Sequence, residues 1–281
     1  MIDTKYTYAV ARIRALETAL FTSATLDQLM ACQTEEQCLQ LIQEKGWGGA
    51  DTPVNAEAIL TREQEKIWEN IRDLGVDMSV FDVLSYPNMF HNLKAAIKDV
   101  CTEENGKSMN IYYDDTAISP DEMLEIVRSK DFSRLPKYMA GAAKEAYETL
   151  LHTRDGQLCD VIVDKAALEA IYAAGKEAKD SIIKDYAEST VAIADIKIAV
   201  RSQKTAKNLD FMKRAMAECE SLSVAQLSKA AVSGIDAIVE YLSGTAYAEG
   251  GKAIAESMSA FERWCDNRMM QTMQPQKYQS F

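Results

Sequence analysis

Residues 81–100 contain an amphipathic helical pattern that returns later in the chain. Its central heptapeptide at 92–98, NLKAAIK, is similar to DIKIAVR at 195–201: a polar residue is followed by a branched apolar residue and then by lysine. Leu93, Ala96 and Ile97 are spaced so that they share one face of a helix, and the second copy repeats this spacing. The copies are separated by 195 − 92 = 103 residues. The chain is therefore predicted to contain a long internal repeat.

Three predicted helix starts support the same repeat. The tetrapeptides beginning at Thr25, Ser119 and Ser223 each place Ser or Thr three residues before Gln or Glu. This pattern is typical of a capping box, in which the hydroxyl oxygen accepts a hydrogen bond from an otherwise unpaired backbone N–H. Pro120 follows Ser119 at the first helical position, where its missing N–H costs nothing. The starts lie 94 and 104 residues apart (119 − 25 and 223 − 119), which indicates three helical lobes of similar plan.

The predicted fold class is all-α, with three lobes at 1–115, 116–218 and 219–281. Few Gly and Pro residues and plentiful Ala, Leu, Glu, Lys and Met favour helix over sheet. The best boundary between the first two lobes is 102–116, where acidic and polar residues at 103–106 and at Asp114-Asp115 flank a short β-like segment, 111–113.

Helices are predicted across most of the chain. We expect Pro87 to break or start the helix of 81–100, and Pro275 to end the last helix. The expected helices are 6–21, one from Thr25 that continues through 39–42, 55–74, 81–100, 121–129, 138–152, 157–172, an unusually long 176–218, 224–242 and 253–273, with a loop at 244–251.

The third lobe is expected to be incomplete. The repeated motif follows the cap by 92 − 25 = 67 residues in the first lobe and by 195 − 119 = 76 residues in the second. Either distance, counted from Ser223, leads beyond residue 281. The sequence therefore predicts that the third lobe lacks its own motif helix and that the chain is cut short.

Charge and hydropathy exclude several classes of partner. The formal net charge is −12, which argues against nucleic acid and against direct docking on anionic lipid. No uncharged apolar run approaches the ~20 residues that span a bilayer, so no direct bilayer insertion is expected. The N-terminus lacks the basic and apolar regions of a signal peptide. We expect a soluble, cytoplasmic protein.

The cysteines do not predict a metal site or a disulfide framework. They are widely spaced and include no Cys-x-x-Cys pair, so reduced thiols are expected. The six cysteines are Cys32, Cys38, Cys101, Cys159, Cys219 and Cys265.

No catalytic, cofactor-binding or metal-ligating residue is predicted. His91 and His152 are the only histidines, and neither belongs to a zinc or di-iron motif. We expect His91 to be a hydrogen-bonded structural residue. Asp114-Asp115 resembles the start of a magnesium-binding Asp-Asp-x-x-Asp motif, but Ile118 occupies the last position, and an exposed acidic turn is expected instead.

The glycine-rich segment 244–253, GTAYAEGGKA, resembles a phosphate-binding loop only superficially. Its spacing is one residue too long, and Ala253 follows the lysine where the motif needs Ser or Thr. Nucleotide binding at this segment is not expected.

The chain resembles the C-subunit family of the rotary V/A-type ATPases, whose eukaryotic V-ATPase members are known as d subunits. The residues that carry the resemblance are the N-terminal YTYAVARIR at 6–14, Tyr86-Pro87 with HNLK at 91–94, and the DIK…R pattern at 195–201. The resemblance covers the whole chain. Members of that family usually continue into a further Glu-Ile-Lys-x-x-Arg-like helix, and this sequence stops before it.

The resemblance implies three helical lobes around a pseudo-threefold axis, forming a funnel. It implies a non-catalytic rotor adapter that links the central-stalk subunits to the membrane rotor ring in ATP-coupled proton or sodium transport. Such a protein is cytoplasmic and peripheral to the membrane through the ATPase complex. The alternative is a free-standing cytosolic helical scaffold that binds another protein.

Overall fold

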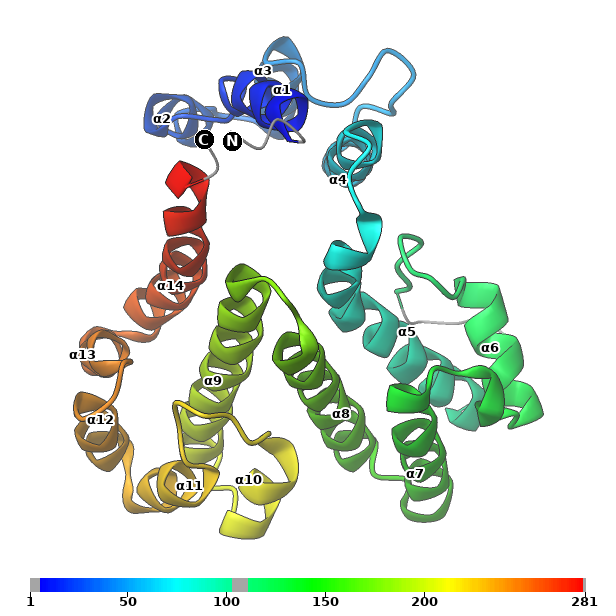
Figure 1. Cartoon of the computed structure of the whole chain (residues 1–281), viewed down its shortest axis with the longest axis vertical. Helices are drawn as coiled ribbons and strands as arrows, with labels where there is room; N and C mark the ends of the chain where they lie inside the picture. Colours follow the sequence, from blue (N-terminus) through cyan, green and yellow to red (C-terminus); the bar gives the residue numbers. More distant parts are fainter. Residues whose placement is uncertain (1–5, 103–110, 280–281) are drawn as a thin grey trace. The chain divides into compact units, whose positions relative to one another are not determined.

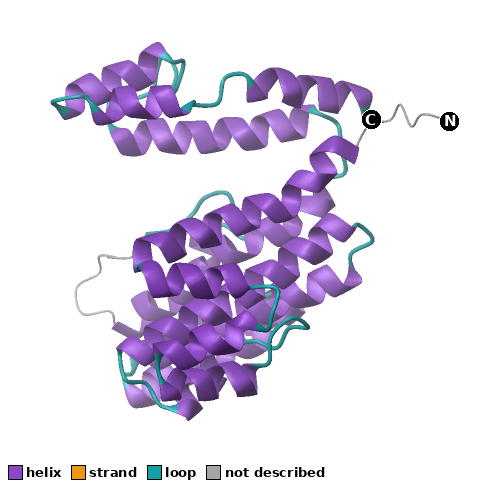
Figure 2. Ribbon diagram, turned by 90° about the vertical axis from the view of Figure 1, so that its left-hand side faces the viewer, coloured by secondary structure: helices purple, strands orange, loops and turns teal. Residues whose placement is uncertain are grey.

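Helices and loops make up the whole of the structure that is described (Figure 2). The computed structural model describes residues 6–102 and 111–279, with side chains up to residue 273. The predicted all-α fold class is confirmed over these residues. The α-helices are α1 Thr7–Glu17, α2 Ser23–Met30, α3 Glu35–Glu44, α4 Ala56–Asp73, α5 Asp82–Thr102, α6 Pro120–Ser129, α7 Lys137–Thr153, α8 Gly156–Glu177, α9 Ser181–Lys204, α10 Leu209–Ala215, α11 Val224–Ser233, α12 Ile235–Ser243, α13 Ala248–Glu256 and α14 Met258–Gln279. Two short 3-10 helices, η1 Met78–Phe81 and η2 Phe132–Arg134, complete the set.

The chain divides into two compact units near residue 80. The first contains α1 to α4 and buries few side chains, chiefly Leu39 and Ile59. Side-chain hydrogen bonds connect α1 with α4: the Arg12 guanidinium donates to the side-chain oxygens of Asn70 and Asp73 at 3.1 and 3.2 Å. Because the Arg12–Asp73 ion pair is largely exposed to solvent, it contributes little to stability.

Trp47 lies just after the end of α3, and its N–H donates to the Ile42 carbonyl at 3.2 Å. Its ring stacks on Phe21 with the centroids 4.4 Å apart, and the side chain is half-buried. The neighbouring Gly48 has a φ of 79°, and its N–H donates to the Glu63 carboxylate at 2.7 Å. A positive φ favours glycine, which explains the glycines on both sides of Trp47.

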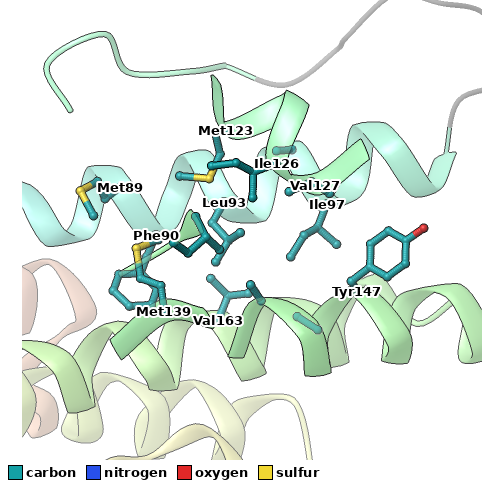
Figure 3. Packing of buried hydrophobic residues seen from close by; sticks show 14 of the residues in the cluster. Met89, Phe90, Leu93, Ile97, Met123, Ile126, Val127, Met139, Tyr147 and Val163 are labelled. Carbon is teal, nitrogen blue, oxygen red and sulfur yellow. The ribbon is translucent and has the colours of Figure 1, made fainter. Parts of the chain in front are cut away.

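The second unit contains two hydrophobic cores. The first core packs α5 against α6, α7 and α8, and Figure 3 shows Phe90, Leu93 and Ile97 of α5 directed toward the side chains of those helices. The predicted apolar face of the motif helix is confirmed, because Leu93, Ala96 and Ile97 are fully buried. The second core packs α9 against α10 to α14, and Ile196 and Val200 from the second motif copy lie inside it.

In each core of the second unit the motif helix comes first along the chain; α5 is followed by the capped helix α6, and α9 is followed by α10 and then by the capped helix α11 (Figure 1). Helix α5 packs against α6, α7 and α8, all of which follow it in the chain. The division into three lobes at 1–115, 116–218 and 219–281 stays a prediction.

Two of the three predicted caps are confirmed. The hydroxyl oxygens of Ser119 and Ser223 accept from the backbone N–H groups of Glu122 and Gln226, both at 3.3 Å. The predicted cap at Thr25 is wrong. Thr22 caps α2, and Thr25 is the residue whose N–H donates to its hydroxyl at 3.3 Å. Both threonines are followed by residues that suit a first helical turn, so the sequence pattern did not separate them.

Replacing Ser119 with alanine is expected to destabilise the protein by about 1 kcal/mol, because the Glu122 N–H loses its acceptor. Ser119→Asp retains an acceptor oxygen and should restore most of the loss. Urea unfolding midpoints of the two variants are the measurement. Equal midpoints for the wild type and Ser119→Ala would show that the cap contributes nothing.

Four predicted helices are corrected by the structure. The one helix expected from Thr25 through 39–42 is wrong, because α2 ends at Met30 and α3 begins at Glu35. The long helix expected at 176–218 is wrong, because the chain turns between Glu177 and Ser181 and again after Lys204, where Ala206 has a φ of 52°. The helix expected at 224–242 is broken at Gly234, with a φ of 133°. The expected loop at 244–251 and helix at 253–273 are also wrong, since α13 begins at Ala248 and α14 at Met258.

Neither proline acts as predicted, since Pro87 neither breaks nor starts its helix and Pro275 does not end its own. Pro87 is the sixth residue of α5, and α14 continues past Pro275 to Gln279. A proline removes one backbone hydrogen bond, and in α5 the deep burial of the following residues holds the helix in place. The β-like segment at 111–113 forms no strand, and the polar residues of the predicted boundary at 103–106 lie outside the described residues.

Candidate functional site

The polar residue that opens each motif copy is completely buried in the structure. Asn92 of α5 and Asp195 of α9 both have 0% exposed surface, although the amphipathic pattern places each beside an apolar face. A buried polar side chain is costly unless it is hydrogen-bonded. Each one is hydrogen-bonded to the backbone of the segment that precedes the next capped helix, at Tyr113 before α6 and at Ala217 before α11. We call these two connecting segments the crossovers, and Asn92 and Asp195 the crossover anchors.

The Asn92 anchor is fully satisfied by the crossover before α6. Its Oδ1 accepts from the Tyr113 N–H at 2.9 Å, and its Nδ2 donates to the Tyr113 carbonyl at 2.8 Å and to Thr116 Oγ1 at 3.1 Å. The amide thus pairs with one residue as a neighbouring strand would. This pairing explains why 111–113 looks extended in sequence without belonging to a sheet.

The Asp195 anchor holds the crossover before α11 in the same way. Its Oδ1 accepts from the Ala217 N–H at 3.1 Å, 22 residues along the chain, where Tyr113 follows Asn92 by 21. Its Oδ2 is buried and has no hydrogen-bond partner in the described part of the chain. Burial raises the pKa of Asp195 to about 8, an effect that Glu218 reinforces and that the Ala217 N–H and Lys165 oppose. The carboxyl is therefore mostly protonated at neutral pH.

Glu188 holds the same crossover at a second point. Its Oε1 accepts from the Ser221 N–H at 2.8 Å and from the Ser221 hydroxyl at 2.5 Å, and its Oε2 accepts from the Glu220 N–H at 3.3 Å. The Ser221 hydroxyl also lies 3.1 Å from the Tyr247 hydroxyl. Residues 216–222 are therefore attached to α9 at both ends, and sequence reasoning missed this network because Glu188 lies outside the repeated heptapeptide.

The lysine of each motif copy makes an ion pair with a helix packed against its own. Lys94 Nζ lies 2.8 Å from Asp164 of α8, and Lys197 Nζ lies 2.6 Å from Glu262 of α14. These pairs are partly exposed, so they fix the helix register more than they add stability. The lysine that both copies share thus has an equivalent structural role in the two cores.

His91 has the structural role that was predicted for it. Its Nε2 lies 2.9 Å from the Ile111 carbonyl, and its ring meets Tyr113 edge-on, with the centroids 5.0 Å apart. His152 is exposed in the last turn of α7, so the two histidines do not share a site. Asp114 and Asp115 are exposed, as expected, and Asn88 Nδ2 donates to Asp115 at 3.1 Å.

Two glycines of 244–253, Gly250 and Gly251, allow close helix packing. A Cβ on Gly250 would lie 2.7 Å from the Trp264 ring, and one on Gly251 would lie 3.3 Å from the Val239 carbonyl. Both glycines are buried within α13, and the Gly251 N–H donates to the Tyr247 carbonyl at 3.2 Å. That this segment binds no nucleotide stays a prediction. Among the residues that the structure describes, no three His, Cys, Asp or Glu side chains come together as a metal site.

The six cysteines are free thiols, as expected. Burial raises the pKa of Cys159 to about 12 and the pKa values of Cys219 and Cys265 to about 11. A thiol with a raised pKa holds little reactive thiolate at neutral pH. These three cysteines therefore have the character of core residues.

The fold and these contacts define an all-helical protein whose second unit contains two similar blocks, each with a motif helix, an anchored crossover and a capped helix. Among the helices that the structure describes, none contains an apolar stretch of the length that a bilayer span requires. A family model described as ATP synthase (C/AC39) subunit matches residues 9–281. The chain belongs to this family, which confirms the resemblance to the C-subunit family of V/A-type ATPases. Comparisons with curated proteins and with solved structures find no match.

Family membership fixes the general role of the chain. It is an accessory subunit of a V/A-type ATPase, of a family distinct from the catalytic subunits. The absence of catalytic, cofactor-binding and metal-binding residues stays a prediction.

Proposed function

We propose that this protein is the rotor adapter of a V/A-type ATPase, linking the central-stalk subunits to the membrane rotor ring. In this role it transmits torque between ATP turnover in the soluble head and proton or sodium translocation in the membrane. It works at the cytoplasmic face and is held there by other subunits. The observation that carries the proposal is the family match over residues 9–281.

The contacts of the second unit suit a part that transmits torque. A rotor part must resist shear between its helices, and the segments most exposed to shear are the crossovers between blocks. Asn92 bonds one crossover at both the N–H and the carbonyl of Tyr113, while Asp195 and Glu188 bond the other at two points. Asn92 and Asp195 are themselves completely buried, so breaking their hydrogen bonds is expensive because it leaves an unsatisfied buried group behind.

The acidic surface indicates how the subunits recognise each other. A chain with a net charge of −12 is attracted over long range to basic surfaces on its partners. Such steering raises the association rate and is screened by salt, since the Debye length falls from ~30 Å at 0.01 M to ~10 Å at 0.1 M ionic strength. Dissociation depends on short-range contacts that salt screens less.

Binding to the isolated central-stalk subunits is the test. We expect a complex at low salt, with an association rate that falls about tenfold or more between 0.01 and 0.15 M ionic strength, while the dissociation rate changes less. Surface plasmon resonance with the full-length protein measures both rates. Failure to bind any stalk subunit at low salt would favour the alternative of a free-standing helical scaffold.

A further inference from the structure

Residues 201–214 form a basic segment in an otherwise acidic chain. Asp210 is its one acidic residue, which gives the segment a net charge of +4 and leaves −12 − 4 = −16 for the rest of the chain. The segment covers the last turn of α9, the connector and α10. Its cations are Arg201, Lys204, Lys207, Lys213 and Arg214.

These five cations have no carboxylate partner among the described residues. By contrast, the two lysines of the first motif copy are paired: Lys94 with Asp164 and Lys98 with Asp160. Lys207 donates to Gln157 Oε1 at 2.6 Å and lies 5.0 Å from the centre of the Phe211 ring, so its charge is positioned but not neutralised. The positive charge of the segment is therefore available to a partner.

A pocket of about 400 Å³ adjoins the segment, bounded by α8, α9 and α10. Arg201 and Lys207 line it together with the apolar side chains of Ile198 and Phe211. A pocket of this size that combines apolar walls with a few polar groups is typical of a binding site. Favourable charge at the end of helix α9 accounts for Arg201 and Lys204, but not for Lys207, which lies beyond that helix.

The chemistry of the pocket favours a protein ligand. Asp160 and Asp164 also line it, and although Lys98 and Lys94 neutralise them, they disfavour a multiply charged phosphate. The charge of −16 outside the segment repels an anionic membrane surface. A peptide brings single carboxylates spaced along a backbone, with apolar side chains between them. We propose that the pocket and segment 201–214 bind an acidic protein segment that carries an apolar side chain between carboxylates.

The inference does not depend on the rotor role, because it rests on local charge and the pocket alone. The probe is a fluorescent peptide of four Glu-Glu-Leu repeats, titrated with the full-length protein at low salt and followed by anisotropy. A peptide of four Gln-Gln-Leu repeats has the same apolar residues without charge. We expect saturable binding of the acidic peptide and at least tenfold weaker binding of the neutral one.

Matched variants locate the site. The double variant Arg201→Gln/Lys207→Gln should bind the acidic peptide about tenfold more weakly, as expected for the loss of two charge pairs beside an apolar contact. Lys144→Gln/Lys252→Gln removes the same charge from exposed positions elsewhere in the second unit and should change binding less than twofold. Circular dichroism and urea midpoints verify that both variants fold.

Three results with the peptides would overturn the proposal. They are no binding of the acidic peptide, equal weakening in both double variants, and equal binding of the neutral peptide. Vesicles of phosphatidylserine and phosphatidylcholine that bind the protein and displace the peptide would assign the segment to a membrane surface instead.

Discussion

Asp195→Asn is expected to stabilise the protein in neutral and alkaline solution, and the gain should increase as the pH rises. The Asp195 carboxyl is completely buried, accepts one hydrogen bond from the Ala217 N–H, and has an Oδ2 without a partner in the described residues. Asparagine is the residue at the equivalent position of the first motif copy, where Asn92 pairs with Tyr113 through both of its side-chain groups. An asparagine at 195 keeps the acceptor for the Ala217 N–H and never carries a charge.

The sign of the effect follows from the pKa of Asp195, which burial raises to about 8 in the folded protein, against about 3.9 in an unfolded chain. The folded state therefore holds this proton more tightly than the unfolded state. Its stabilising contribution is complete below about pH 4 and is lost as the pH rises to about 8, at up to about 1.4 kcal/mol per pH unit. Above pH 8 the loss is constant, on the order of 5 kcal/mol in total.

Urea unfolding of the wild type and Asp195→Asn between pH 5 and pH 9 measures the difference. The gap in unfolding free energy should widen by several kcal/mol between pH 5 and pH 8 and then level off. Asp164→Asn is the matched control, because Asp164 is an exposed partner of Lys94 and its replacement leaves the buried anchor intact. Parallel pH profiles for the wild type and Asp195→Asn would mean that Asp195 ionises normally in the folded protein.

The crossover anchors show what the sequence could and could not predict. The repeated heptapeptide correctly placed Asn92 and Asp195 at equivalent positions, and the apolar faces of both motif helices are buried as expected. Helical periodicity, however, treats a polar residue beside an apolar stripe as exposed. The groups that satisfy Asn92 and Asp195 are backbone atoms more than 20 residues away, which no local pattern records. A polar residue conspicuous at the same place in two copies was the available signal.

Helix ends were harder to predict where close packing decides them. Ser119 and Ser223 are caps because of local side-chain chemistry, so the sequence pattern located both. Just before the end of α8, Gly175 lies so close to the next helix that a Cβ on it would be 2.2 Å from Ala187 Cβ, a contact that no local pattern records. The basic segment 201–214 was visible in the sequence, but its significance depends on the missing carboxylate partners and on the adjoining pocket.

Gly175→Ala is expected to be among the most damaging conservative changes in the chain. A Cβ at this position would lie 2.2 Å from Ala187 Cβ and 3.4 Å from the Ile183 carbonyl oxygen, so α8 and α9 must separate to admit it. The contacting atom is attached directly to the α9 backbone and cannot rotate away. We expect a destabilisation of about 2–3 kcal/mol, reduced somewhat by the better helix propensity of alanine.

Gly141→Ala is the matched control, because Gly141 is an exposed helical glycine of α7 with no atom within 4 Å of its expected Cβ. This variant should be more stable by about 0.5–1 kcal/mol, since alanine loses less backbone entropy on folding. A second test uses Ala187→Gly in the Gly175→Ala background, which removes the opposing methyl group. The double variant should recover part of the lost stability in a double-mutant cycle. Opposite signs for the two glycine variants, with recovery in the double variant, would establish that the contact between Gly175 and Ala187 sets the turn between α8 and α9.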